Sequence, residues 1–138
     1  MRAKLLVGSA LALTATSFVA CTDITGLGYS NVSGSYELET FNGFTLPTIS
    51  YQDGFEQHEL LAETFTLYSD GTYTDDYTIR VSSRNGSSQS SHRDLGTFQQ
   101  NNNALQFRDS ATGDIFTGSI TGNTLTVTQL GDTYVHRR

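Results

Sequence analysis

Apolar and polar side chains alternate with a period of two along most of the chain from residue 57 onward. This pattern is typical of β-strands that bury one face. Short turn-forming segments interrupt it at Asn85-Gly86, Asn101-Asn102, Gly122-Asn123 and Leu130-Gly131. With residues 36–40 as part of a first strand, the predicted strands are approximately 34–40, 57–68, 72–83, 88–99, 103–109, 113–120, 124–130 and 132–137.

The turns also predict which residues face one another. Asn85-Gly86 is taken as the centre of a two-residue turn, and Ser69-Asp70-Gly71 as a three-residue turn. The predicted cross-strand pairs are Leu67 with Tyr73, Leu61 with Ile79, Tyr73 with Phe98, Phe98 with Leu105, Ile120 with Leu125, and Val127 with Tyr134. Each hairpin places apolar side chains on the same face as the one before it, and a one-residue slip would invert the next strand. This agreement indicates one continuous antiparallel sheet.

Eight such strands predict an all-β fold, an eight-stranded antiparallel up-and-down β-barrel. A half-open sheet or a sandwich is the structural alternative. Residues 55–63 have a helix-forming composition and are an alternative helical segment. We favour a strand from about residue 57, because Leu61, Phe65 and Leu67 share one parity.

The first 20 residues have the layout of an export signal. Arg2 and Lys4 precede an uncharged, mostly apolar stretch over residues 5–20, which is short for a transmembrane helix. Phe18-Val19-Ala20-Cys21 resembles the bacterial lipobox, and Cys21 is the only Cys of the chain. The alternative is a secretory signal in which Cys21 is incidental. Lipidation of Cys21 would supply several acyl chains and a stable membrane anchor.

These features divide the chain into three parts. We expect a signal peptide over 1–20, the lipidated Cys with a polar tether over 21–33, and the barrel over 34–138. By resemblance to Gram-negative lipoproteins, Thr22 after the Cys favours the outer membrane of the cell envelope.

The charge balance excludes two classes of partner. The chain has 138 residues and a net charge of -6, and after Cys21 it carries six Arg and no Lys against 14 acids. Neither a nucleic-acid footprint nor a polybasic membrane-surface patch is therefore expected.

Several short motifs resemble the bacterial lipocalin-like lipoproteins. They are Gly34-Ser35-Tyr36, Asn42-Gly43 before Leu46-Pro47, residues 67–73 (LYSDGTY), Gly96-Thr97-Phe98, residues 122–126 (GNTLT), and residues 134–138 (YVHRR). The resemblance implies a small barrel in the bacterial envelope and suggests that it binds a lipophile. Lipocalins open the first strand with Gly-x-Trp and pack a late Arg over the Trp. This chain has no Trp, and the resemblance puts Tyr36 in its place, with Arg137 or Arg138 as the cation.

The long connection 41–56 is predicted to be a lid over one end of the barrel. It is the only long connection, and it is rich in apolar side chains. The lid either completes the core or contacts a ligand. The candidate ligand-binding residues of lid and interior are Phe41, Phe44, Leu46, Ile49, Phe65, Tyr73, Tyr77, Phe98, Phe107 and Phe116.

An acidic rim is predicted at the same end. Glu63, Asp94, Asp109 and Asp114 share the inward parity with Tyr77, and together they would attract a cation or a cationic amphiphile. The alternative is a wet rim of solvated acids. Asp75, one tier deeper, is the acid that we expect inside the barrel.

The sequence predicts no catalytic residue, cofactor or metal site. His58, His92 and His136 lack metal-ligand spacing, a Gly-x-Ser-x-Gly elbow is absent, and one Cys allows no Cys-based zinc site. We therefore expect an envelope barrel, not an enzyme, that binds a small, partly apolar ligand. The alternative is a structural or protein-interaction lipoprotein with a barrel filled by side chains.

Overall fold

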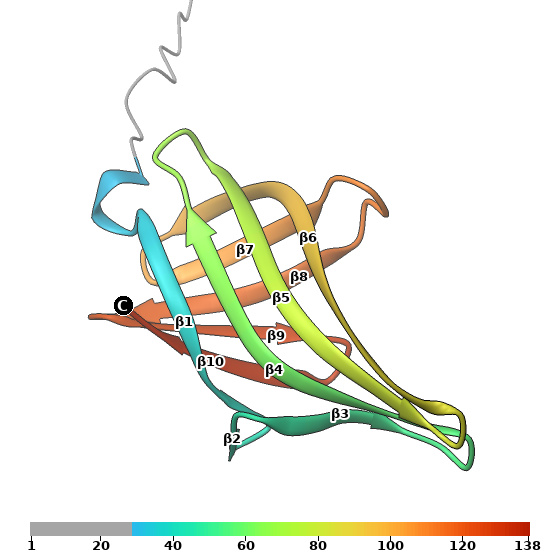
Figure 1. Cartoon of the computed structure of the whole chain (residues 1–138). Helices are drawn as coiled ribbons and strands as arrows, with labels where there is room; N and C mark the ends of the chain where they lie inside the picture. The colour runs from blue at the N-terminus through green and yellow to red at the C-terminus, as the bar shows by residue number, and fades with distance from the viewer. Residues whose placement is uncertain (1–28) are drawn as a thin grey trace, which may run out of the picture.

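The computed structural model describes residues 29–138. They form a short 3-10 helix and ten antiparallel strands (Figure 1). The elements are η1 (Tyr29–Asn31), β1 (Gly34–Phe41), β2 (Phe44–Thr45), β3 (Thr48–Gln52), β4 (Glu56–Leu67), β5 (Thr72–Ser83), β6 (Gly86–Asn101), β7 (Ala104–Asp109), β8 (Ile115–Thr121), β9 (Thr124–Gln129) and β10 (Asp132–Arg137). The predicted signal peptide and Cys21 lie outside the described residues.

Eight of these strands close into the predicted barrel. The sheet runs β2-β1-β10-β9-β8-β7-β6-β5-β4-β3, and β1 also pairs with β4. The closing ladder pairs Gly34 with Leu67 and Tyr36 with Phe65. This ladder excludes the half-open sheet and the sandwich. The helical alternative for residues 55–63 is also excluded, because strand β4 begins at Glu56.

The predicted register is confirmed for three hairpins and wrong by two residues for two others. Leu67 faces Tyr73, Ile120 faces Leu125 and Val127 faces Tyr134, as predicted. Tyr73 instead faces Gly96, and Phe98 faces Phe107. Since side chains alternate with a period of two, this error leaves every side chain on its predicted face.

The two wrong registers have a local cause in the turns. The β5–β6 turn is centred on Arg84-Asn85, because Ser83 pairs with Gly86. Gly86 directly follows the turn and has a φ of 125°. The β6–β7 turn is centred on Asn102-Asn103, where Asn102 has a φ of 55°. Gly86 and Asn102, the residues with positive φ, thus each occupy a place in the turn that differs by one position from the predicted place.

Aromatic side chains fill the half of the barrel near η1. The rings of Phe107 and Phe116 stack with their centroids 5.0 Å apart, and Phe65 stacks on Tyr73 at 4.9 Å. The buried cluster in this half comprises Val32, Tyr36, Phe65, Leu67, Tyr73, Phe98, Leu105, Phe107, Phe116, Ile120, Leu125 and Val127. The interior of this half is therefore a packed core without room for a ligand.

The chain before β1 closes that end of the barrel. Val32, which the sequence assigned to the tether, is a core residue, and the ring of Tyr29 lies 4.7 Å from that of Phe98. The guanidinium carbon of Arg138 lies 5.3 Å from the centre of the Tyr36 ring, which is the cation–π contact predicted for one of the two terminal Arg residues.

Strands β4, β5 and β6 extend beyond the barrel at the opposite end (Figure 1). The segment predicted as a lid forms strands β2 and β3 there, and β3 pairs with the start of β4. Bulges interrupt β1 between Leu38 and Thr40, and β4 between Leu60 and Ala62. Because of the second bulge, Leu60 faces Ile79, and the prediction that Leu61 does so is wrong.

Candidate functional site

A cavity of about 280 Å³ opens at the end of the barrel opposite η1. The walls come from β4, β5, β6, β9 and β10, together with the β9–β10 turn and Ser50 of β3. Its lining residues are Ser50, Leu60, Glu63, Phe65, Asp75, Tyr77, Ile79, Asp94, Val127, Gln129, Leu130, Asp132 and Tyr134. We call this space the mouth cavity.

The bulges of the nearby strands shape this cavity. The β4 bulge turns Leu60 inward, where it is 4% exposed, and Leu60 packs with Leu38 and Phe41. A further bulge in β3, between Ile49 and Tyr51, falls at Ser50, which lines the cavity. Bulges commonly redirect side chains beside functional sites, because the extra residue changes which face the strand presents.

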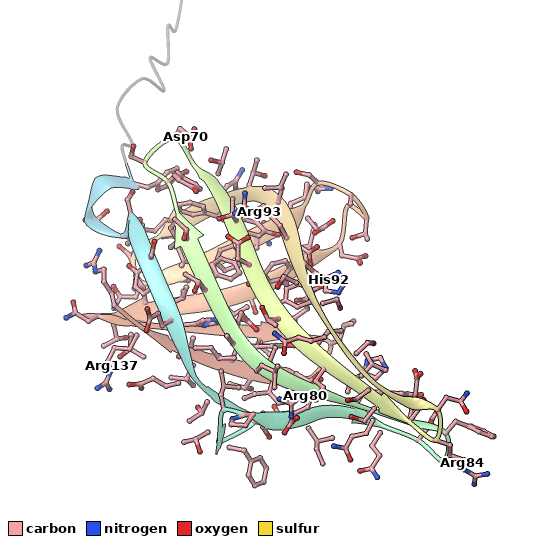
Figure 2. The ribbon with its side chains drawn as sticks, viewed as in Figure 1. Asp70, Arg80, Arg84, His92, Arg93 and Arg137 are labelled. Carbon is pink, nitrogen blue, oxygen red and sulfur yellow. The ribbon has the colours of Figure 1, made fainter. Side chains whose placement is uncertain are left out.

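The lining carries acids and no base. Glu63, Asp75, Asp94 and Asp132 line the cavity, whereas no Lys, Arg or His does. All six Arg residues of the described chain lie on the exposed surface. Figure 2 shows Arg84 at the tip of the β5–β6 hairpin and Arg137 outside the barrel. Within residues 29–138, no Arg side chain is therefore buried in the barrel interior.

Asp75 has the least satisfied carboxyl group of the site. Its Oδ1 is enclosed and has no hydrogen-bond partner among the described residues. On the sheet it lies between Phe65 of β4 and Asp94 of β6. Burial first, and then the nearby carboxyls of Glu63 and Asp94, together raise the Asp75 pKa to about 9. At neutral pH the carboxyl is therefore protonated when nothing else balances its charge.

Glu63 and His136 form a buried hydrogen-bonded pair at the base of the cavity. Glu63 Oε1 lies 2.7 Å from His136 Nε2, and the two residues are 7% and 0% exposed. Burial raises the pKa of Glu63 to about 8 and lowers the pKa of His136 to about 4. Both shifts disfavour the charged forms, so the pair is a hydrogen bond between neutral groups near pH 7. On the sheet, His136 faces Leu125 of β9.

Two tyrosines form the aromatic part of the wall. Tyr77 stacks on His92 with ring centroids 5.2 Å apart, and Tyr134 meets the edge of Phe41 at 5.0 Å. Burial raises the pKa of both phenols, and the carboxylates nearby act in the same direction. Both hydroxyl groups therefore stay protonated at every physiological pH.

The predicted interior and lid residues separate into three groups. Phe65 and Tyr77 line the cavity, and Phe41 and Leu46 pack against its wall. The deep aromatics Tyr73, Phe98, Phe107 and Phe116 belong to the filled core and do not line the cavity. Phe44 and Ile49 are 68% and 48% exposed, so these lid side chains do not cover the cavity in this structure.

The structure brings only half of the predicted acidic rim to the cavity. Glu63 and Asp94 line it, but Asp109 and Asp114 do not. Asp109 instead orders the β7–β8 loop, where the backbone N–H groups of Ala111 and Thr112 each donate to its Oδ1 at 2.7 Å. These hydrogen bonds, that of Thr112 above all, lower the pKa of Asp109.

Asp132 is a cavity residue that the sequence prediction missed. It faces Gln129 across the β9–β10 turn, and both line the cavity. The predicted turn at Leu130-Gly131 already implied this pair, because it fixes the register of the hairpin.

Other candidate sites are weaker. A hollow of about 560 Å³ lies near η1, but its lining contains no acid and no base apart from the phenol of Tyr29. Within residues 29–138, no three His, Asp or Glu residues lie close enough together to hold a metal ion. The same part of the chain contains no helix long and apolar enough to cross a membrane.

No model of a known protein family matches the chain, and no curated protein sequence matches it. The barrel and its cavity are therefore the features that point to a function.

Proposed function

We propose that this protein is a lipid-anchored barrel of the bacterial cell envelope that binds a small, partly apolar ligand in the mouth cavity. The observation that carries the proposal is the cavity itself, which combines apolar walls with an unsatisfied buried carboxyl group. Its volume of about 280 Å³ lies just below the range of roughly 300–1,000 Å³ common for small-molecule sites. The ligand is therefore small.

The described chain begins at the end of the barrel opposite the cavity. Tyr29, the first described residue, packs on Phe98 at the filled end. The cavity opens at the other end, where β4, β5 and β6 extend beyond the barrel (Figure 1). A lipid on Cys21 would hold the barrel by its closed end and leave the mouth accessible. We place the anchor in the outer membrane because Thr22 follows Cys21.

The resemblance to lipocalin-like lipoproteins supports the same proposal. The contact of Arg138 with Tyr36 has the form that the resemblance implied for a barrel without Trp. Arg138 also donates to the carbonyl oxygen of Ser33 at 2.8 Å, which ties the end of the chain to the start of β1. We therefore propose membership in this group of proteins, with binding rather than catalysis as the activity.

A protein-interaction module is the second candidate. Exposed apolar side chains gather on the segment before β4, where Phe44, Tyr51 and Phe55 are 68%, 49% and 80% exposed. Apolar groups presented in this way commonly mark contact surfaces.

One experiment on protein purified from its own host tests both parts of the proposal. Native mass spectrometry should show a chain that begins at Cys21 and carries acyl groups, together with an additional non-covalent mass that dissociates on activation. A chain without acyl groups would contradict the anchor. Absence of bound mass would count against the binding function only together with a negative result in the following assay.

The assay measures uptake of N-phenyl-1-naphthylamine, a neutral probe that fluoresces in apolar surroundings. Gln129→Trp places a bulky side chain in the cavity and should abolish uptake. Thr128→Trp is the matched control, because Thr128 is exposed on the outer face of the same strand. Equal uptake by the two variants would show that the probe binds elsewhere and would favour the interaction module.

A further inference from the structure

We infer that the ligand of the mouth cavity is a cation, namely a protonated amine that carries a short apolar group, and that Asp75 accepts a hydrogen bond from the ammonium. This inference rests on the proposed binding function and adds to it the charge of the ligand and the residue that recognises it.

Asp75 has an enclosed carboxyl oxygen that lacks a hydrogen-bond donor within residues 29–138. Other acids of β4 and β5 have partners: Glu63 pairs with His136, and Asp76 pairs with Arg93. Asp75 Oδ1 is enclosed at the cavity wall and accepts nothing from the described residues. Buried acceptors in proteins nearly always have a donor. A donor brought by the ligand completes this site.

The sign of the charge around the cavity also points to a cation. Four acids line it, and no basic residue does. An anionic ligand would meet these carboxyl groups without a counter-charge, and a neutral ligand would leave their charges unbalanced whenever they ionise. A cation is the ligand charge that this lining favours.

The apolar and aromatic remainder of the lining indicates the rest of the ligand. Leu60, Ile79 and Val127 offer aliphatic contacts, and the rings of Tyr77 and Tyr134 are placed beside the acids. Aromatic rings attract alkylammonium groups in partly dehydrated sites. The lining thus suits a molecule with a charged head and a short apolar body, and the volume excludes a long-chain lipid.

Binding of the amine is coupled to release of a proton. The titratable and charged groups that face or flank Asp75 come from β4, β5, β6 and β10, and they are Glu63, Tyr73, Asp76, Tyr77, His92, Asp94, Asp132, Tyr134 and His136. The cavity lining contains no Lys, Arg or His, and burial raises the Asp75 pKa to about 9, so the empty site holds the Asp75 carboxyl in its protonated form. When the ammonium binds, the carboxyl ionises and its proton passes to solvent.

The test compares three ligands that have the same apolar body. Hexylammonium, 1-hexanol and hexanoate differ only in their polar head, and isothermal titration calorimetry gives their affinities for the full-length protein. We expect hexylammonium to bind about tenfold or more tightly than 1-hexanol, since hydrogen bonds to charged groups exceed neutral ones. Hexanoate should bind least. Titrations in buffers of different ionisation enthalpy should show up to one proton released per hexylammonium at pH 7.

Two neighbouring substitutions provide the matched variants. Asp75→Asn keeps the shape of the side chain and removes its charge, and it should weaken hexylammonium binding about tenfold while leaving 1-hexanol unchanged. Asp76→Asn is the control, because Asp76 lies on the opposite face of the same strand, where its Oδ1 accepts from Arg93 Nε at 2.5 Å. The control should bind both ligands like the parent protein.

The outcomes separate this inference from the proposed function. If 1-hexanol binds as tightly as hexylammonium, or if Asp75→Asn leaves amine binding unchanged, the inference is wrong and the binding function stands. If no hexyl ligand binds but the neutral naphthylamine probe does, the inference is also wrong. If nothing binds, both fail. Should Asp75→Asn not fold, proton release by the parent protein decides, and its absence overturns the inference.

Discussion

Tyr36 and Arg138 show how one pair of residues closes the filled end of the barrel. Tyr36 is fully buried, and its hydroxyl donates to the carbonyl oxygen of Val32 at 2.6 Å. The Arg138 guanidinium lies over the ring and also packs against Gly34, where a Cβ atom would lie 2.9 Å from the Arg138 side chain. The absence of a side chain at residue 34 thus leaves room for the cation that covers Tyr36.

Asp75 and Glu63 make the stability of the fold dependent on pH, because folding buries their carboxyl groups without a counter-charge. Their pKa values rise on folding from 3.8 to about 9 and from 4.5 to about 8. A group whose pKa is raised by folding contributes its stability below the unfolded pKa and loses it as the pH rises through the folded pKa. His136 behaves in reverse, since its lowered pKa costs stability only as the pH falls below about 6.5 toward 4.

Above pH 6.5, the change of stability with pH therefore reflects the carboxyl groups of Asp75 and Glu63 and not His136. We predict that the free energy of unfolding of the ligand-free protein decreases from pH 6.5 to pH 9. The slope is at most about 1.4 kcal/mol per pH unit for each proton involved. Asp75→Asn should flatten this dependence and be relatively more stable at pH 9. Urea unfolding at a series of pH values measures both curves.

Asp76→Asn serves as the control for this measurement as well. It removes an exposed ion pair and should keep the slope of the parent protein. A slope that is the same in Asp75→Asn as in the parent would contradict the buried, unbalanced carboxyl.

At the scale of the elements, the alternation of side chains predicts the strands well. All eight barrel strands were placed to within about two residues, because each turn carries Gly, Asn or Asp. The faces were also predicted correctly through β5 to β10, even where the register was wrong by two. An even error preserves the face, so the pattern cannot reveal it.

The bulges were beyond the reach of the sequence pattern. An extra residue at Leu61 exchanges the inward and outward positions of the first part of β4, and no residue type there demands it. The prediction therefore put Leu61 rather than Leu60 opposite Ile79. The same limitation applies to the predicted lid. A bulge separates Ile49 from Tyr51 in β3, and both side chains are exposed.

Gly96 allows close packing within the β5–β6 hairpin. It faces Tyr73, and a Cβ atom at this position would collide with the Tyr73 ring and with the carbonyl oxygen of Arg108. The ring of Tyr73 thus lies across the glycine, with its own face stacked on Phe65. The missing side chain makes this cross-strand contact possible.

We therefore predict that Gly96→Ala destabilises the barrel by about 1–3 kcal/mol, as overpacking of a core does. Gly54→Ala is the matched control, because a Cβ atom there meets nothing within 4 Å, and its effect should stay within about 0.5 kcal/mol. Thermal and urea unfolding measure both changes. If Gly96→Ala is as stable as Gly54→Ala, the close packing of Tyr73 on Gly96 is wrong.

At the scale of the whole molecule, the barrel is divided into a packed half and an open half. The sequence predicted an interior rich in aromatics, but it did not show that Tyr73, Phe98, Phe107 and Phe116 gather at one end. That arrangement follows from the tilt and closure of the strands, which a pattern along one strand does not contain. It leaves the acids and Tyr77 around the remaining space at the mouth.

The acidic rim shows the same limit. Glu63 and Asp94, which share the inward parity, both line the cavity, as does Asp75, although Asp94 is itself exposed. Parity gave the same assignment to Asp109 and Asp114, yet the β7–β8 loop uses Asp109 for its own backbone hydrogen bonds. Whether an acid at the end of a strand lines a cavity or orders a loop depends on loop geometry, which the strand pattern does not specify.

The enclosed carboxyl group of Asp75 in the mouth cavity is proposed to bind a cationic ligand. The most direct measurement is a carbon-13 NMR titration of the Asp75 side-chain carboxyl, first without ligand and then with saturating hexylammonium. We predict that Asp75 titrates with a pKa of about 9 in the empty barrel and with a markedly lower value when the amine is bound. A carboxyl that titrates near 3.8 in the empty barrel and does not respond to hexylammonium would contradict the account.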